Sequence, residues 1–202
     1  LARITGGEQV CEAIPDIEIG NRIWSDINSN GIQDANDPGL PNVSVELFAD
    51  FDLNGIPDGA ALATTTTGAD GTWIFKTSNV TDGDPITPGA QPGLLPLSGY
   101  IVRLGSSSWT AGQGVGNLVG YSLTLSNIGG TGQPDVRDND ATIPTSGIPT
   151  IALKTGNLGE NNHSFDIGLK NTCGISVIAF TNTSVCNDNG TATNLTDDYY
   201  TA

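Results

Sequence analysis

A run of oxygen-bearing side chains, residues 26–37, is the part of this sequence that most clearly predicts chemistry. Such side chains fall at positions one, three, five, nine and twelve of the run, with glycine at six and isoleucine at seven. This spacing is typical of an EF-hand-type calcium loop, in which glycine allows the sharp turn and the seventh residue offers its carbonyl oxygen. The predicted ligands are Asp26, Asn28, Asn30, Ile32, Asp34 and Asp37.

Asp37 stands where such loops usually carry a bidentate glutamate. This replacement leaves the ligand set plausible but is expected to weaken it. The alternative interpretation is a turn rich in Asp and Asn between two strands, stabilised only by hydrogen bonds from the backbone to its own side chains.

A second segment, residues 50–58, repeats positions one, three, five, six, seven and nine of the first. Its predicted ligands are Asp50, Asp52, Asn54, Ile56 and Asp58. Position twelve is Ala61, so the closing carboxylate is missing. Either a ligand arrives from elsewhere, with Asp70 as the candidate, or the second site is hydrated and weaker.

A third acidic segment, residues 135–140, has carboxylates but matches no defined loop. Asp135, Asp138 and Asp140 are candidates to bind one ion together; the alternative is a solvated loop in which Arg137 pairs locally. Crowded carboxylates repel one another, and Ca²⁺ converts that repulsion into ligation. The sequence therefore predicts two to three Ca²⁺ ions.

The composition agrees with loops of this kind and excludes several classes of protein. The 202 residues include 17 Asp but only 5 Glu, and the net charge is −15. A chain this acidic repels nucleic acid and anionic membrane surfaces, so neither is expected as a partner. With 27 Gly and 11 Pro, a helical bundle is also excluded.

The elements that must position these loops are short strands. Eight runs rich in Val, Ile, Thr and aromatic residues are separated by clusters of Gly, Asp, Asn and Pro, which predicts an all-β sandwich. In the last run, Phe165, Ile167 and Leu169 are expected to face the core, and Ser164, Asp166 and Gly168 to face water. The eight expected strands are Ile17–Trp24, Val43–Ala49, Ala61–Thr67, Thr72–Lys76, Tyr100–Leu104, Tyr121–Leu125, Thr150–Lys154 and Ser164–Leu169.

The chain is expected to contain one complete module and two partial ones. Residues 1–16 are interpreted as the end of a preceding module or a linker, residues 17–170 as the calcium-binding sandwich, and residues 171–202 as the start of a following β module with a strand at 175–180. Two long loops, residues 77–98 and 128–149, interrupt the sandwich. The start of the chain lacks the pattern of a signal peptide, and no run reaches the roughly 20 apolar residues of a membrane span.

Three stretches carry a family resemblance. Ile19–Asp34, Pro38–Leu47 and Ala63–Phe75 resemble the B-type domain of the serine-aspartate-repeat surface adhesins (SdrD B-like) and, more distantly, the collagen-adhesin B domain. The closing Ser164–Leu169 resembles the last strand of that family. The resemblance implies an immunoglobulin-like β-sandwich that binds calcium and acts as a spacer or stalk in a large secreted or cell-surface bacterial protein.

The resemblance also extends to individual residues. The family's calcium positions fall on the first loop, and Asp70, Asp138 and Asp140 resemble further acidic positions, whereas the second loop departs from the family. Collagen-adhesin domains often carry a Lys-to-Asn crosslink, but Arg22 occupies the expected lysine position, so no crosslink is expected.

The chain has three cysteines, Cys11, Cys173 and Cys186. An odd number fits a fragment whose missing partner lies in an adjacent segment, and three unpaired thiols are the alternative. Because the segment from residue 173 resembles the start of a further surface-protein module, a Cys173–Cys186 disulfide is expected, with Cys11 pairing elsewhere.

Catalysis is not expected. The lone His163 is interpreted as a surface residue, and no nucleophile-and-base pattern, phosphate loop or zinc spacing is present. The leading hypothesis is a calcium-stiffened structural module whose partners are adjacent modules of the same protein. The alternatives are a ligand-binding adhesin head that contacts a host or matrix protein or a glycan, and a filament subunit that adds strands to neighbouring copies. Six Asn-X-Ser/Thr sequons occur in the sequence. Either they are glycosylation sites, or they arise by chance in a chain rich in Asn and Thr.

Overall fold

The computed structural model describes residues 15–172, apart from 85, 88, 111 and 129–135, together with two short strands near the C-terminus. Contacts divide the chain into two compact units, Leu1–Thr172 and Cys173–Ala202. The second unit is described only by β11 (Val185–Asn187) and β12 (Tyr199–Thr201), which pair antiparallel. The expected strand at 175–180, together with Cys11 and Cys173, lies outside the described residues, so the disulfide stays a prediction.

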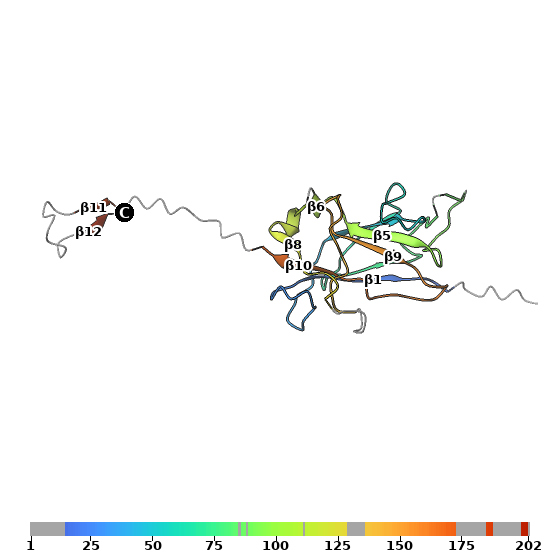
Figure 1. The fold of residues 1–202 in the computed structure, drawn as a ribbon, viewed down its shortest axis with the longest axis horizontal. Helices are drawn as coiled ribbons and strands as arrows, with labels where there is room; N and C mark the ends of the chain where they lie inside the picture. Colours follow the sequence, from blue (N-terminus) through green and yellow to red (C-terminus); the bar gives the residue numbers. More distant parts are fainter. Residues whose placement is uncertain are drawn as a thin grey trace, which may run out of the picture. The chain divides into compact units, whose positions relative to one another are not determined.

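Two four-stranded sheets form the first unit, as the sequence predicted (Figure 1). The first sheet has the order β4-β1-β10-β8, with strands Thr72–Phe75, Ile19–Ser25, Ile167–Asn171 and Tyr121–Leu123. The second has the order β3-β2-β5-β9, with strands Ala63–Thr66, Ser44–Ala49, Gly99–Leu104 and Thr150–Lys154. Each of the eight expected strands overlaps an observed one, although the last lies at Ile167–Asn171 rather than Ser164–Leu169, and the all-β, immunoglobulin-like sandwich is confirmed.

Alternating apolar side chains explain why the two sheets pack face to face. Val45 and Leu47 of β2 are fully buried, and so are Tyr100, Val102 and Leu104 of β5. Apolar residues of the first sheet, among them Phe75, Ile167 and Leu169, belong to the same core cluster. Burial of apolar surface between the sheets is the main force that holds them together.

One expectation about the last strand is wrong. Asp166 and Gly168 are buried rather than wet, because β10 lies between β1 and β8 and its second face is covered. A Cβ on Gly168 would meet Trp24 at 2.6 Å and Thr124 at 2.7 Å, so only glycine fits there. The alternating pattern correctly predicted which residues of β10 face the core. It gave no information on what packs against the other face of this strand.

Short elements complete the first unit. Trp109–Thr110 (β6) pairs with Gln113–Gly114 (β7), and a 3₁₀ turn, η1, spans Gly116–Leu118. Hydrogen bonds to a buried side chain hold the long loop 77–98 in place. The buried hydroxyl of Tyr100 accepts a hydrogen bond from Leu95 N (2.8 Å) and donates one to Gly83 O (3.0 Å).

The direction of the first and last strands of the sandwich positions the candidate sites. β1 and β10 pair in parallel, with Ile23 opposite Ile167 and Ser25 opposite Leu169. β1 therefore begins at one end of the sandwich, and β10 finishes at the other. The first predicted loop, 26–37, starts at that second end, directly after β1.

Candidate metal centres

The first loop adopts a tight turn that its own side chains hold. Asp26 Oδ2 accepts a hydrogen bond from Gly31 N (2.8 Å), and Asp26 Oδ1 accepts one from Asn30 N (3.2 Å). Asn30 Oδ1 in turn accepts from Ile32 N at 2.7 Å. The predicted ligands at positions one and five therefore shape the backbone around a common centre.

Asp34 and Asp37 close this loop in different ways. Asp34 Oδ2 accepts hydrogen bonds from the side-chain amides of Asn28 (2.8 Å) and Asn30 (3.0 Å), so these three predicted ligands converge. Asp37 is 4% exposed and accepts from Ile27 N (3.1 Å) and Asp34 N (3.0 Å). The carboxylate of Asp37 thus joins the two ends of the loop.

The second loop, which follows β2, repeats the geometry of the first. Asp50 accepts from Asn54 N (3.0 Å) and Gly55 N (3.1 Å), and Asn54 Oδ1 accepts from Ile56 N (2.7 Å). Positive φ angles occur at positions four and six of both loops: 59° at Ser29 and 81° at Gly31, 57° at Leu53 and 77° at Gly55. The two loops therefore share a backbone conformation as well as a spacing of residues in the sequence.

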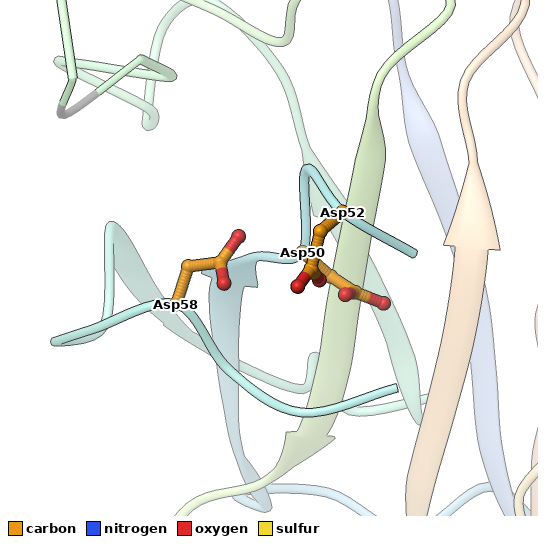
Figure 2. Close-up of side chains that lie close together, drawn as sticks. All are labelled: Asp50, Asp52 and Asp58. Carbon is orange, nitrogen blue, oxygen red and sulfur yellow. The ribbon is translucent and has the colours of Figure 1, made fainter. Parts of the chain in front are cut away.

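Three carboxylates converge in the second loop (Figure 2). Oxygen atoms of Asp50, Asp52 and Asp58 lie within 4.8 Å of one another, and Figure 2 shows Asp58 pointing across the loop toward the other two. Asp58 Oδ2 also accepts from Phe51 N at 2.7 Å. A hydrated, weaker site was one of the two interpretations of the second loop, yet three acidic groups gather there most closely among the described residues.

The structure does not bring Asp70 to the second loop. Asp70 lies in the turn between β3 and β4, at the opposite end of β3 from residues 50–58. Its carboxylate accepts from Thr72 N (3.1 Å) and Thr72 Oγ1 (2.7 Å), which lowers its pKa. No closing ligand reaches the second loop from this turn.

The third acidic segment is divided between two places. Asp138 forms a backbone bridge with Ile32 of the first loop and is 6% exposed. Asp140 instead lies against Asp166, whose backbone N donates to Asp140 Oδ2 at 2.6 Å. Asp135 lies outside the described residues. A single ion held by all three aspartates therefore has no support from the placement of Asp138 and Asp140.

Sequence reasoning missed the support that two residues, Thr124 and Asn139, give to the first loop. Thr124 Oγ1 donates to Asp26 Oδ2 at 2.5 Å. Asn139 is fully buried, its backbone N donates to Gly31 O (3.3 Å), and its Oδ1 accepts from Gly168 N (3.1 Å). Asn139 thereby joins the loop to β10, and Asp166 links β10 to β1. These partners are 98 and more than 100 residues from the loop positions that they support, so no local spacing could reveal them.

The donor chemistry of both loops fits a hard cation. Asp26, Asp37 and Asp50 are 1%, 4% and 2% exposed. The predicted ligand atoms are all oxygens, the type that Ca²⁺ prefers. Within the described part of the chain, the ion pair that involves either loop is Arg137–Asp34, at 3.8 Å and largely exposed. The buried carboxylates are thus compensated mainly by backbone N–H groups, an arrangement that a divalent cation would complement.

Other features bear on catalysis and on membranes. His163 is exposed, as expected, and its Nε2 lies 3.4 Å from Glu18 Oε2. In the described part of the chain, no helix has the length and apolar character to cross a membrane.

Comparisons with known proteins bear on part of the chain. Residues 17–85 match the family model of the SdrD B-like domain, which confirms the resemblance over that stretch. Serine-aspartate repeat-containing protein E of Staphylococcus aureus (strain MSSA476) is 39% identical over 61 residues, 30% of this chain and 5% of that protein. Colossin-B of Dictyostelium discoideum is 47% identical over 36 residues, 18% of this chain and 1% of that protein. The matches thus span a small fraction of both relatives.

The comparison with solved structures is much weaker. The shaft pilin SpaA from Lactobacillus rhamnosus GG aligns over 79% of this chain and 52% of its own, with 11% identity and a TM-score of 0.39. A similarity at this level carries no argument about function.

Proposed function

We propose that the chain is a non-catalytic, calcium-stabilised structural module of a secreted or cell-surface repeat protein, with adjacent modules of the same protein as its partners. The SdrD B-like match over residues 17–85 supports the module and its surface setting. The relatives, of which the chain covers small fractions, support a module that is part of a longer protein. The domain limits 1–16, 17–170 and 171–202 belong to this proposal.

The parallel pairing of β1 and β10 is the observation that carries the proposal. Because β1 begins at one end of the sandwich and β10 finishes at the other, tension along the chain loads the hydrogen bonds between these two strands in shear. The pairing is extended on both sides. Arg22 N donates to Asp166 Oδ1 at 3.0 Å before the paired residues, and Asp26 N donates to Leu169 O at 2.8 Å after them. All of these bonds must break together, which is the property required of a stalk.

The first loop lies where it can reinforce this pair of strands. Asp26 is both the first predicted ligand and the residue that extends the β1–β10 pairing. Bound Ca²⁺ would supply positive charge between the loop carboxylates and fix their positions. Holding Asp26 and Asp37 together keeps the end of β1 against β10.

The second loop would act on the other sheet. It begins directly after β2, which pairs with both β3 and β5. Its ligand set is Asp50, Asp52, Asn54, Ile56 and Asp58, without Asp70. With one ion in each loop, the net charge of −15 would fall in magnitude to about −11, taking +2 per ion.

Single-molecule force spectroscopy on the full chain, held at its two ends, tests the proposal. We expect a higher unfolding force in Ca²⁺ than in chelator, and loss of that difference in Asp26→Ala. Asp84→Ala, at a half-buried position outside the three acidic segments, is the matched control and should keep the difference. Equal unfolding forces with and without Ca²⁺ would contradict the calcium part of the proposal. A low force in both would contradict the structural part.

A further inference from the structure

The outer face of the second sheet carries an apolar pair that does not belong to the core between the sheets. Side chains alternate along a strand, and Val102 and Leu104 of β5 face the core, so Ile101 and Arg103 face outward. Phe48 of β2, directly opposite Ile101, also faces outward. Phe48 and Ile101 are nevertheless 4% and 0% exposed. Other parts of the protein therefore cover this pair.

A groove lies over this part of the sheet, and two loop segments line it. Ile56 and Pro57 come from the second loop, and Pro144 comes from the segment that precedes β9. The groove has a volume of about 280 Å³. It is large enough for one amino-acid residue, since a cavity of about 150 Å³ already holds a benzene molecule.

Arg103 is the charged residue among those that line the groove, and its guanidinium is held in one orientation. Its Cζ lies 4.1 Å from the centroid of the Phe48 ring. Its Nε and Nη2 donate to the same oxygen of Glu46, Oε2, at 3.2 and 3.1 Å. A guanidinium stacked on a ring and bound to a carboxylate is positioned before any ligand arrives.

The bonds to Glu46 use one edge of the guanidinium and leave another. Nη1 and the second N–H of Nη2 make no hydrogen bond to a residue that the structure describes. These two nitrogens present parallel N–H groups, which match the two oxygens of a carboxylate. Because Arg103 lines the groove and Glu46 does not, a ligand in the groove can reach the free edge.

The charge around the groove also favours a carboxylate. The net charge of the chain is −15, yet no acidic residue is among those that line this groove in the described part of the chain. The remaining lining is apolar or carries hydroxyl groups. An anionic group that enters the groove therefore contacts a guanidinium and no carboxylate.

We propose that this groove binds the C-terminal residue of a peptide, with its α-carboxylate on Arg103. A branched apolar side chain of that residue contacts Ile56, Pro57 and Pro144. A charged side chain is excluded there, because these walls offer it no partner. The exposed residues 145–146, Thr and Ser, lie at the rim, where their hydroxyls can bond to the preceding peptide backbone.

Titration of a peptide into the isotope-labelled full chain, followed by NMR in the presence of Ca²⁺, tests the groove. The probe is acetyl-Gly-Gly-Ser-Gly-Leu with a free C-terminus, and the comparison is the same peptide with a C-terminal amide. We expect the acid to shift the amide signals of Ile101, Arg103 and Thr150, and the amide form to bind about tenfold more weakly, since charge-assisted hydrogen bonds are lost. Equal binding of the two peptides, or no shift of these signals with the acid, would overturn the proposal.

Variants of the two halves of the groove locate the bound peptide. Arg103→Lys keeps the positive charge beside Glu46 but lacks the parallel N–H groups, so we expect it to bind the acid peptide about tenfold more weakly. Ile56→Ser removes an apolar side chain that is 64% exposed, so the fold is retained, and it should also weaken binding. Ile86→Ser, at a position 71% exposed and outside the groove, is the matched control and should bind as wild type does. If Arg103→Lys and Ile56→Ser both bind as wild type does, the groove is not the site.

This binding function is separate from the calcium-stabilised role. The second loop holds its part of the groove by its own hydrogen bonds, from Gly55 N to Asp50 Oδ2 at 3.1 Å and from Ile56 N to Asn54 Oδ1 at 2.7 Å. The side chain of Ile56 contacts the ligand, whereas its carbonyl oxygen is the predicted calcium ligand. Peptide binding by a chain whose Tm does not respond to Ca²⁺ would support the groove and contradict the calcium proposal. A Tm that responds to Ca²⁺ without peptide binding would refute the groove alone.

Discussion

The buried aspartate at the start of each loop holds the loop backbone by hydrogen bonds and is also a predicted cation ligand. Mutation can separate these two roles. Asp26 is 1% exposed and accepts hydrogen bonds from Asn30 N, Gly31 N and Thr124 Oγ1. The backbone bonds shape the loop, and the remaining coordination capacity of the carboxylate is what a cation would use. A substitution at this position therefore has a cost in chelator and a further cost in Ca²⁺.

Asp26→Ala should lower the free energy of unfolding in chelator by about 1–3 kcal/mol, because it leaves buried donors without their acceptor. In Ca²⁺ the difference from wild type should grow, since the variant lacks the first ligand. Urea titration in both buffers measures the two differences. An equal difference in both buffers would show that Asp26 is structural only.

Tyr100 is the residue from which a pH dependence follows. Burial raises its pKa to about 12, whereas an unfolded tyrosine ionises near 10. Between these values the folded state holds more protons than the unfolded state, so the free energy of unfolding should fall as pH rises from 10 to 12. Tyr100→Phe should flatten this slope and cost about 1–3 kcal/mol at pH 7, because Leu95 N and Gly83 O lose their partner.

Urea titrations of wild type and Tyr100→Phe across that pH range test this expectation. Tyr121→Phe, at a half-buried position, is the matched control. If the slope persists in Tyr100→Phe but disappears in Tyr121→Phe, the pH dependence comes from Tyr121 and the prediction is wrong.

At the scale of elements, periodic patterns in the sequence predicted the strands and their core-facing residues. They did not predict which residues cover the other face of a strand. Val45 and Leu47 alternate with polar residues along β2, so the strand and its core face could be predicted. The buried state of Asp166 could not be predicted, because it depends on Asn139 and Asp140, which lie against residues 166–168. The ladder β6–β7 and the turn η1 are too short to leave a pattern.

The metal ligands divide in the same way. The spacing of Asp50, Asp52 and Asp58 predicts a common loop, and the three carboxylates do meet. Asp70 was a candidate to close this loop, in one of the two interpretations of the second segment. This interpretation failed because β3 carries the chain to the other end of the sandwich before Asp70 is reached.

Close backbone approach between turns gives a prediction at the element scale. A Cβ at Gly39 would lie 1.7 Å from the backbone oxygen of Asp70, in the turn that also binds Arg22. Gly39→Ala should therefore destabilise the fold by about 1–3 kcal/mol, since the two turns must separate. Gly68→Ala, where the nearest atom is the side-chain oxygen Asp70 Oδ1 at 3.3 Å, is the control for thermal unfolding. Equal Tm values for the two variants would contradict the close packing.

At the scale of the whole molecule, the acidity and the topology point to one function. The net charge of −15 opposes folding through self-repulsion, and the proposed ions act where carboxylates are most crowded. In chelator, monovalent salt should also raise the Tm by screening, but only at concentrations far above those at which Ca²⁺ acts. A thermal-unfolding series in NaCl and in CaCl₂ compares the two; coincident curves at equal ionic strength would show that screening alone is at work.

Thermal unfolding of the full chain, first in chelator and then with increasing Ca²⁺, tests the binding of calcium by the folded loops most directly. Because a ligand that binds only the folded state adds RT ln(1 + [L]/Kd), a hundredfold excess over Kd contributes about 2.7 kcal/mol per site. We expect a large, progressive rise in Tm that Asp26→Ala and Asp50→Ala each reduce. An unchanged Tm in wild type across the Ca²⁺ series would contradict calcium binding by these loops.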